Sequence, residues 1–247
     1  GEWLTKAANG EQSAAQYVLG KLYQDSVYFN KDMDQAMKWF RSAAELGNEY
    51  AAYRMGCLLL LGEEIPKDVE AAVKWLSLSA EKGNPYAQYR LGMLYLKGEV
   101  FSPQVEVAMK WLQQAAEQKN EWAFYQLGKL YLSGEHVTKN VETAVHYLGL
   151  CAEKGNQYAQ YVLGKLYLCG RDVSRDREKA VEYLTASAEQ GNLYASFLLE
   201  HLDAYQDPSL FLAATRLLHH LEKLFCEEVQ RPMEMKRYQI DRKRRRK

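Results

Sequence analysis

The sequence predicts an all-α protein built as a linear array of 36-residue helix-turn-helix units. Glycines recur every 36 residues, columns of alanine and leucine recur with them, and the apolar residues of each unit fall at two sets of helical spacings. The recurring glycines are Gly20, Gly56, Gly92, Gly128 and Gly164. A fixed period of this length is typical of a solenoid, in which each unit buries its apolar face against its neighbours. We therefore expect function on a surface, because no unit encloses a pocket by itself.

The elements follow in order along the chain. Trp3, Ala7 and Ala8 occupy columns of a second helix, so we expect residues 1–10 to be the end of a truncated repeat and the chain to begin in the middle of an array. About five full repeats and a partial one are expected over residues 11–205. In the full repeats after the first one, a first helix ends at a connector glycine that adopts a positive φ, and a second helix follows. The connector glycines are Gly62, Gly98, Gly134 and Gly170.

Three local features refine this prediction. The asparagines that follow a glycine between repeats, such as Asn48 and Asn84, are expected to cap the next first helix. Glycine in mid-helix costs about 1 kcal/mol relative to alanine. We therefore expect the Gly20 column to allow close contact with the aromatic column that begins at Trp39. Residues 24–31 contain no glycine, so the first connector is expected to have a different shape.

The repeat ends before the C-terminus. Residues 206–230 keep a helical apolar stripe and are predicted to form a helix that caps the end of the array. Residues 231–247 form a basic tail with nine basic and two acidic side chains. Because the whole chain has a formal net charge of zero, residues 1–230 carry the opposite excess of acidic side chains.

Residues 87–95 (AQYRLGMLY) and 159–167 (AQYVLGKLY), each followed by glycine and later by an Ala-Glu-x-Gly-Asn type of ending, resemble Sel-one-like repeats (SLR). The resemblance covers about residues 1–205. It implies a right-handed α/α superhelical solenoid related to tetratricopeptide arrays, and it implies an adaptor that holds other proteins together. The first helices of such solenoids line a concave groove.

One aromatic column departs from this family pattern near the start of the first helices. These aromatic residues either pack between neighbouring first helices or form an exposed ladder. The second alternative predicts that a protein or an extended peptide lies along the concave groove, with Arg54, Arg90 and Gln126 as polar neighbours. The residues of the column are Tyr50, Tyr86, Trp122, Tyr158 and Tyr194. A following column, Tyr53, Tyr89, Tyr125, Tyr161 and Phe197, is expected to belong mainly to the core.

The basic tail offers an alternative function, nonspecific DNA binding, although a solvated charge run explains it equally well. The candidate residues are Lys236, Arg237, Arg242, Lys243, Arg244, Arg245, Arg246 and Lys247. Segments 156–168, 215–220 and 241–247 resemble the C-terminal regions of mobilisation relaxases from bacterial conjugative elements. This resemblance implies an accessory region of a DNA-nicking protein whose chemistry lies upstream, so no tyrosine of this chain is expected to be catalytic.

The sequence offers no catalytic or cofactor chemistry. It has no Gly-rich phosphate loop and no nucleophile with an adjacent base, and His219, His220 and Cys226 do not form a metal-binding pattern. The four cysteines lie inside helical patterns and favour a reducing compartment. We therefore expect a non-enzymatic scaffold in a bacterial cytoplasm, without a cofactor, a metal or a membrane segment. The sequence does not predict its oligomeric state.

Overall fold

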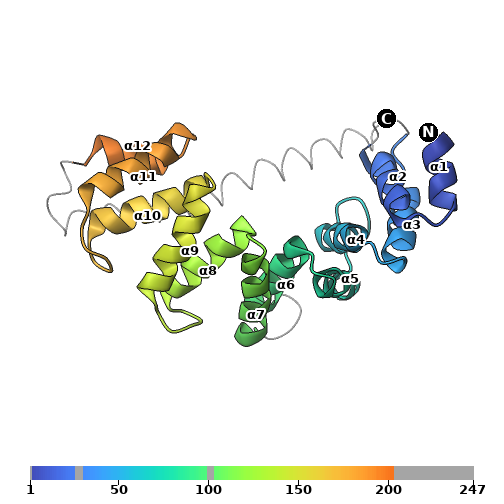
Figure 1. Cartoon of the computed structure of the whole chain (residues 1–247), viewed down its shortest axis with the longest axis horizontal. Helices are drawn as coiled ribbons and strands as arrows, with labels where there is room; N and C mark the ends of the chain where they lie inside the picture. The colour runs from blue at the N-terminus through green and yellow to red at the C-terminus, as the bar shows by residue number, and fades with distance from the viewer. Residues whose placement is uncertain (1, 26–29, 99–102, 203–247) are drawn as a thin grey trace, which may run out of the picture. The chain divides into compact units, whose positions relative to one another are not determined.

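A computed structural model describes residues 2–25, 30–98 and 103–202, which form twelve α-helices and no strand (Figure 1). The chain divides into two compact units, residues 1–154 and residues 155–247. The first unit contains α1 (Glu2–Asn9), α2 (Ser13–Asp25), α3 (Met33–Glu45), α4 (Glu49–Leu61), α5 (Val69–Glu81), α6 (Pro85–Lys97), α7 (Val105–Glu117), α8 (Glu121–Ser133) and α9 (Val141–Glu153). The described part of the second unit contains α10 (Gln157–Cys169), α11 (Arg177–Glu189) and α12 (Leu193–Glu200).

Helices pack against their neighbours in chain order within each unit. The most extensive contacts join a first helix to the second helix that follows it: α2 to α3, α4 to α5, α6 to α7, α8 to α9, and α10 to α11. Smaller contacts join successive pairs, for example α3 to α4 and α5 to α6. The predicted helix pairs are therefore confirmed, and they stack as a solenoid.

Asparagine side chains begin the first helices, as the sequence predicts. The Oδ1 atom of Asn48 accepts a hydrogen bond from the backbone N–H of Ala51 at 3.0 Å, and Asn84 accepts from Tyr86 and Ala87 in the same way. Asn120, Asn156 and Asn192 cap α8, α10 and α12. These bonds satisfy N–H groups that have no partner inside the helix.

The connector glycines end the first helices in the left-handed region, with φ angles of 63° to 71°. The backbone N–H of Asp68 then donates to the carbonyl of Leu59 at 3.1 Å and closes the connector between α4 and α5. The first connector lies partly outside the described residues. Within the described part, Asp32 N–H donates to the carbonyl of Tyr23 at 3.1 Å, which is the equivalent bond.

The mid-helix glycines permit close helix contact, but their partners differ from the prediction. A Cβ atom at Gly56 would lie 2.6 Å from Leu76 Cγ, and one at Gly92 would lie 2.7 Å from Leu112 Cγ. The contacting column is Phe40, Leu76, Leu112, Leu148 and Leu184, one residue after the expected Trp39 column. The prediction of the Trp39 column was wrong because its members stay half-buried, whereas the following residue points into the helix pair and is fully buried.

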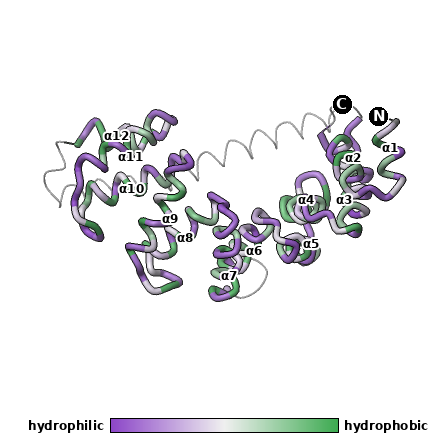
Figure 2. The backbone as a smooth tube through the Cα atoms, in the orientation of Figure 1, coloured by the Kyte–Doolittle hydropathy of each residue, from purple (hydrophilic) through white to green (hydrophobic). Residues whose placement is uncertain are grey.

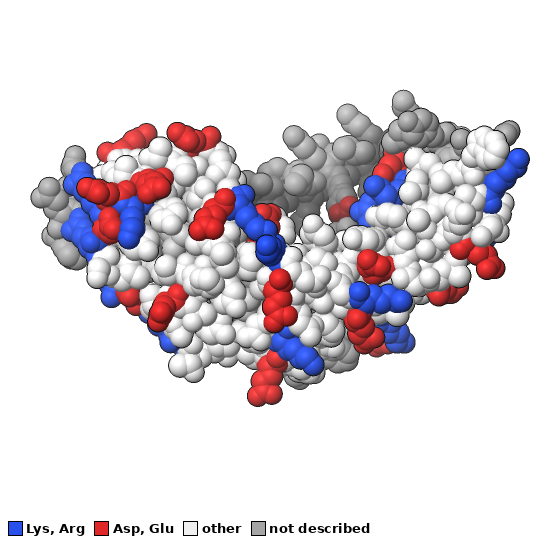
Figure 3. Space-filling model, viewed as in Figure 1, with Lys and Arg blue, Asp and Glu red and all other residues white. Residues whose placement is uncertain are grey.

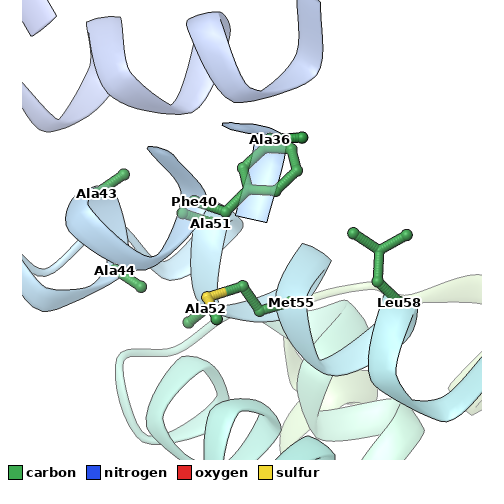
Figure 4. Packing of buried hydrophobic residues seen from close by; sticks show 8 residues of the cluster. All are labelled: Ala36, Phe40, Ala43, Ala44, Ala51, Ala52, Met55 and Leu58. Carbon is green, nitrogen blue, oxygen red and sulfur yellow. The ribbon is translucent and has the colours of Figure 1, made fainter. Parts of the chain in front are cut away.

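Small residues bring successive repeats together. Figure 4 shows one cluster of eight buried side chains from α3 and α4, in which the Phe40 ring and Met55 lie among alanines. The cluster consists of Ala36, Phe40, Ala43, Ala44, Ala51, Ala52, Met55 and Leu58. Alanine lets the helices approach closely, so the core is continuous along the stack instead of being enclosed by one repeat.

Side-chain hydrogen bonds also tie the two helices of a repeat together. Ser79 Oγ near the end of α5 donates to the carbonyl of Glu49 at 2.7 Å, and Ser187 Oγ makes the same bond to Gln157 in the second unit. Cys151 takes this position in α9, where its Sγ atom lies 3.4 Å from the carbonyl of Glu121. Cys151 is fully buried and is therefore a core residue.

Candidate protein-binding surface

Every first helix of the first unit after α2 exposes one large aromatic side chain at its second residue. Tyr50 and Tyr86 are each 50% exposed, and Trp122 is 41% exposed. The asparagine cap and the buried alanine at the third helical residue, such as Ala87, fix the direction of this side chain. We define Tyr50, Tyr86 and Trp122 as the aromatic stripe. In the second unit, Tyr158 and Tyr194 occupy the equivalent position, exposed and half-buried respectively.

The following aromatic column supports the stripe from beneath. Tyr53, Tyr89 and Tyr125 are half-buried on the same helices. The ring centroids of Tyr53 and Tyr86 lie 6.0 Å apart, so a ring of one repeat contacts the stripe ring of the next. The two alternatives from the sequence therefore combine, because the stripe packs against its neighbour on one side and faces solvent on the other.

Polar side chains link neighbouring first helices beside the stripe. Arg90 on α6 donates a hydrogen bond to the phenol of Tyr53 on α4, and Tyr89 is hydrogen-bonded to Gln126 on α8. Burial raises the pKa of Tyr53 to about 12, although Arg90 opposes this shift. Tyr53 thus stays neutral at physiological pH and keeps the Arg90 side chain positioned.

Arg54 lies one turn after Tyr50 and is half-buried. Its Nε atom is buried and has no hydrogen-bond partner. Neither Arg54 nor Arg90 forms an ion pair with a carboxylate within the described ranges. The predicted groove residues Arg54, Arg90 and Gln126 therefore lie beside the stripe, and the two guanidinium groups keep unused donors.

A pocket opens beside Arg90 between α4, α5 and α6. Its walls are apolar at Leu60 and Met93, and the thiol of Cys57 also lines it. The lining includes Arg90, Lys67 and Lys97 but no carboxylate. Sequence reasoning missed this pocket because its residues come from three helices, and only the helix packing brings them together.

The described residues contain no cluster of three potential metal ligands. Burial raises the pKa of Cys57, and it raises the pKa of Cys151 and of Cys169 to about 11. These three cysteines are free thiols, and a raised pKa disfavours the thiolate that a nucleophile needs. The thiols of the described part thus fit packing positions.

Several predicted residues lie outside the described part. These are the capping helix at 206–230, the basic tail at 231–247 with its candidate DNA-binding residues, and His219, His220 and Cys226. Among the described helices, none has the length and apolar character needed to cross a membrane, and hydrophilic residues recur along them in Figure 2.

The fold and the exposed stripe define a helical repeat protein with an interaction surface. The Sel1 repeat model matches residues 13–48, 49–84, 85–120, 123–156 and 157–192. These matches cover more than half of the chain, so the chain belongs to the Sel1 repeat family. Proteins of this family are generally scaffolds for protein–protein interaction and are typically non-catalytic.

Solved structures agree with this assignment. The chain is 30% identical to c5321, a protective antigen present in uropathogenic Escherichia coli strains that displays an SLR fold, with a TM-score of 0.77; the match covers 87% of this chain and 47% of that protein. The chain therefore spans about half the length of that antigen. It is also 32% identical to a Sel1 repeat protein from Oxalobacter formigenes, with a TM-score of 0.70, covering 75% of this chain and 76% of that one.

A more distant structure is the immunity protein PA5088 from Pseudomonas aeruginosa, at 22% identity and a TM-score of 0.53, covering 76% of this chain and 71% of that one. At this identity the likeness shows the fold alone. A comparison with curated proteins finds no match.

Proposed function

We propose that this chain is a non-enzymatic scaffold that binds an extended segment of a partner protein along the aromatic stripe of its first unit. The observation that carries the proposal is the recurrence of an exposed aromatic at the same helical position in three successive repeats, Tyr50, Tyr86 and Trp122. Tyrosine and tryptophan offer a large apolar area and a polar tip, which is why interfaces are enriched in them.

The stripe side chains are held in place before a partner binds, and this preorganisation supports the proposal that they form the binding surface. The stripe residues sit on helices that are capped by Asn48, Asn84 and Asn120, and the Tyr86 ring rests on Tyr53 of the preceding repeat. A partner then orders few side chains of the scaffold when it binds, so less entropy is lost. In the second unit, Tyr158 and Tyr194 occupy the equivalent helical positions.

Replacing the three stripe residues with alanine tests the proposal. Full-length chain and the Tyr50→Ala/Tyr86→Ala/Trp122→Ala variant are immobilised, and proteins captured from a bacterial lysate are quantified by mass spectrometry. A protein captured by the parent chain is then purified, and calorimetry measures its affinity for the parent chain and for the triple variant. We expect at least a tenfold loss of affinity, because central aromatic residues dominate binding energy at interfaces.

The matched control is Leu46→Ala, which removes an exposed apolar side chain at the C-cap of α3 that is not a member of the stripe. It should bind the partner as the parent chain does. Equal binding by the triple variant and the parent chain, with both folded by circular dichroism, contradicts the proposal.

A second candidate function rests on the basic tail, whose nine basic side chains suit phosphate binding. In this version the chain is a DNA-binding accessory region of a bacterial conjugative relaxase, and the cytoplasmic location proposed from cysteine usage fits either version. DNA affinity is measured against salt with and without residues 231–247. Loss of affinity and of its salt dependence on truncation supports DNA binding, and an unchanged affinity removes it.

A further inference from the structure

Charge is segregated between the two kinds of helix in the first unit. The first helices α4, α6 and α8 contain two carboxylates, both at the first helical residue, and four basic residues, Arg54, Arg90, Lys97 and Lys129. The second helices α5, α7 and α9 contain six carboxylates and two lysines. Figure 3 shows that charges lie in small groups separated by wide uncharged areas. Of the helices that carry the aromatic stripe, α6 is therefore net basic and α4 and α8 are net neutral, whereas α5, α7 and α9 are all net acidic.

The two guanidinium groups beside the stripe have unused hydrogen-bonding capacity. Arg54 has a buried Nε–H without a partner, so its guanidinium is not fully satisfied within the described part of the chain. Arg90 is exposed and is held by the neutral Tyr53 phenol instead of by a carboxylate. An incoming anion would accept charge-assisted hydrogen bonds from the guanidinium nitrogens of both arginines that face solvent.

The pocket beside Arg90 suits the same kind of partner. Lys67 and Lys97 lie in its lining with Arg90, while Leu60 and Met93 provide apolar walls. A ligand that carries both carboxylates and short apolar side chains would contact the basic residues and the apolar residues of this pocket together. A continuous polyanion would use only the basic residues.

The repeat spacing limits the conformation of the ligand. Packed helices lie about 8–10 Å apart. The rings of Tyr53 on α4 and Tyr86 on α6 are in contact, so we take the general spacing of packed helices as the approximate interval between the backbone positions of Arg54 and Arg90. A polyproline II helix has three residues per turn and a rise of about 3.1 Å, so every third side chain returns to one face after about 9 Å. Aromatic-lined grooves bind this conformation in other proteins.

We infer that the partner segment is an acidic peptide in the polyproline II conformation, with carboxylates at every third residue that face Arg54 and Arg90 and with apolar residues between them. This inference rests on the proposed function, because it uses the same stripe. Nucleic acid fits less well, because one basic side chain per repeat is sparse for a ligand with a charge on every phosphate.

The test uses full-length chain and fluorescein-labelled twelve-residue peptides, read by fluorescence anisotropy. The probe is four copies of Pro-Leu-Glu. The comparison peptides are four copies of Pro-Leu-Gln, four copies of Pro-Leu-Lys, and a peptide with the composition of the probe but with its four glutamates adjacent. We expect the probe to bind about tenfold more tightly than each of the others, and we expect its affinity to fall severalfold between 50 mM and 300 mM salt.

Charge-neutral variants locate the binding site. Arg54→Gln/Arg90→Gln should lose about tenfold in affinity for the probe. The matched control Lys74→Gln/Lys110→Gln removes the same charge from exposed positions of α5 and α7, and it should stay within twofold of the parent chain. If the double arginine variant is unfolded by circular dichroism, Arg90→Gln alone serves, because Arg90 is exposed.

The outcomes separate this inference from the proposed function. Equal binding of the glutamate, glutamine and lysine peptides, or no binding of the probe, overturns the acidic partner. If the three peptides bind equally and their affinity falls in the Tyr50→Ala/Tyr86→Ala/Trp122→Ala variant, the aromatic stripe remains the binding surface of the proposed function. Probe binding that depends on the arginines but not on the stripe places the peptide outside the proposed groove and overturns both. If a 20-base-pair DNA duplex binds more tightly than the probe, and Arg54→Gln/Arg90→Gln weakens that binding, the inference of an acidic peptide is also overturned.

Discussion

The first helices α4, α6 and α8 and the second helices α5, α7 and α9 have the same length, yet their outer faces differ. Both kinds supply one side of the core, through pairs such as Gly92 and Leu112. The first helices expose aromatic and basic side chains, whereas the second helices expose three times as many carboxylates as lysines. Packing fixes the inner columns in every repeat, so the outer face of the first helices is where the chain is free to encode a partner.

The caps of the two kinds of helix differ as well. Asparagine caps every first helix from α4 onward. Among the second helices, Asp32, Asp68 and Asp176 cap α3, α5 and α11, Asn140 caps α9, and α7 has no side-chain cap bond. Asn84 and Asn120 are buried, but Asp68 is exposed. A carboxylate in the buried position would lose its hydration, so the neutral amide suits the link between repeats.

The largest expected effect comes from the second-helix side of the core. Leu112 is fully buried, and Leu112→Ala should lower the free energy of unfolding by about 3 kcal/mol, because it leaves a cavity against Gly92. Tyr86→Ala on the exposed face of α6 should lower it by less than about 1 kcal/mol. Urea unfolding of both variants measures the difference. Similar losses would mean that the stripe belongs to the core.

Glycine replacements should have opposite signs on the two kinds of helix. A Cβ atom in Gly92→Ala would meet Leu112 Cγ at 2.7 Å and the Ala108 carbonyl at 3.1 Å, so overpacking should cost about 2 kcal/mol. Gly149 in α9 has no atom within 4 Å of an added Cβ, so Gly149→Ala should gain about 0.5–1 kcal/mol from helix propensity. Thermal unfolding measures both changes.

A double variant sharpens this test. Gly92→Ala/Leu112→Ala should be less destabilised than the sum of the single changes, because the added methyl group occupies space that the shortened side chain leaves. Strict additivity would show that the two residues are not energetically coupled.

Replacing the helix caps should change the free energy of unfolding by less than the core replacements do. Asn84→Ala should cost about 1–2 kcal/mol, because it leaves the N–H groups of Tyr86 and Ala87 without their acceptor in a buried link. Asp68→Ala should cost less, since water reaches the freed N–H group of Ala71. Hydrogen exchange at these amides, measured beside global unfolding, reports which cap is lost. An equal cost for both would contradict the role given to burial.

The smallest expected effect is a dependence on pH at a second-helix cap. The backbone N–H of Lys179 donates to Asp176 at 3.0 Å and lowers the pKa of this carboxyl below its usual value. The folded state therefore binds fewer protons there, and the stabilisation present above the unfolded pKa, about 3.9, is lost as pH falls through the folded pKa. Asp176→Asn should remove this part of the acid sensitivity in melting curves between pH 6 and pH 2. Parallel curves for both proteins would contradict it.

The repeat pattern was sufficient to predict the helix pairs, the connector glycines and the asparagine caps. These features depend on residues close in sequence, such as Asn84 with Ala87 or Gly62 after Leu58. The pattern did not predict which residue of the second helix contacts the mid-helix glycine. Trp75 and Leu76 are adjacent and both apolar, and only the rotation of α5 against α4 decides which of them faces Gly56.

The sequence by itself determined the array, its period and the position of one extra aromatic column in each repeat. Only the tertiary structure decided that Tyr50, Tyr86 and Trp122 face solvent, that Arg90 reaches Tyr53 of the preceding repeat, and that Cys57 and Lys97 line one pocket. Helical periodicity places residues on a common face within one helix. Exposure and contact between repeats depend on how the helices rotate and pack, which no single repeat specifies.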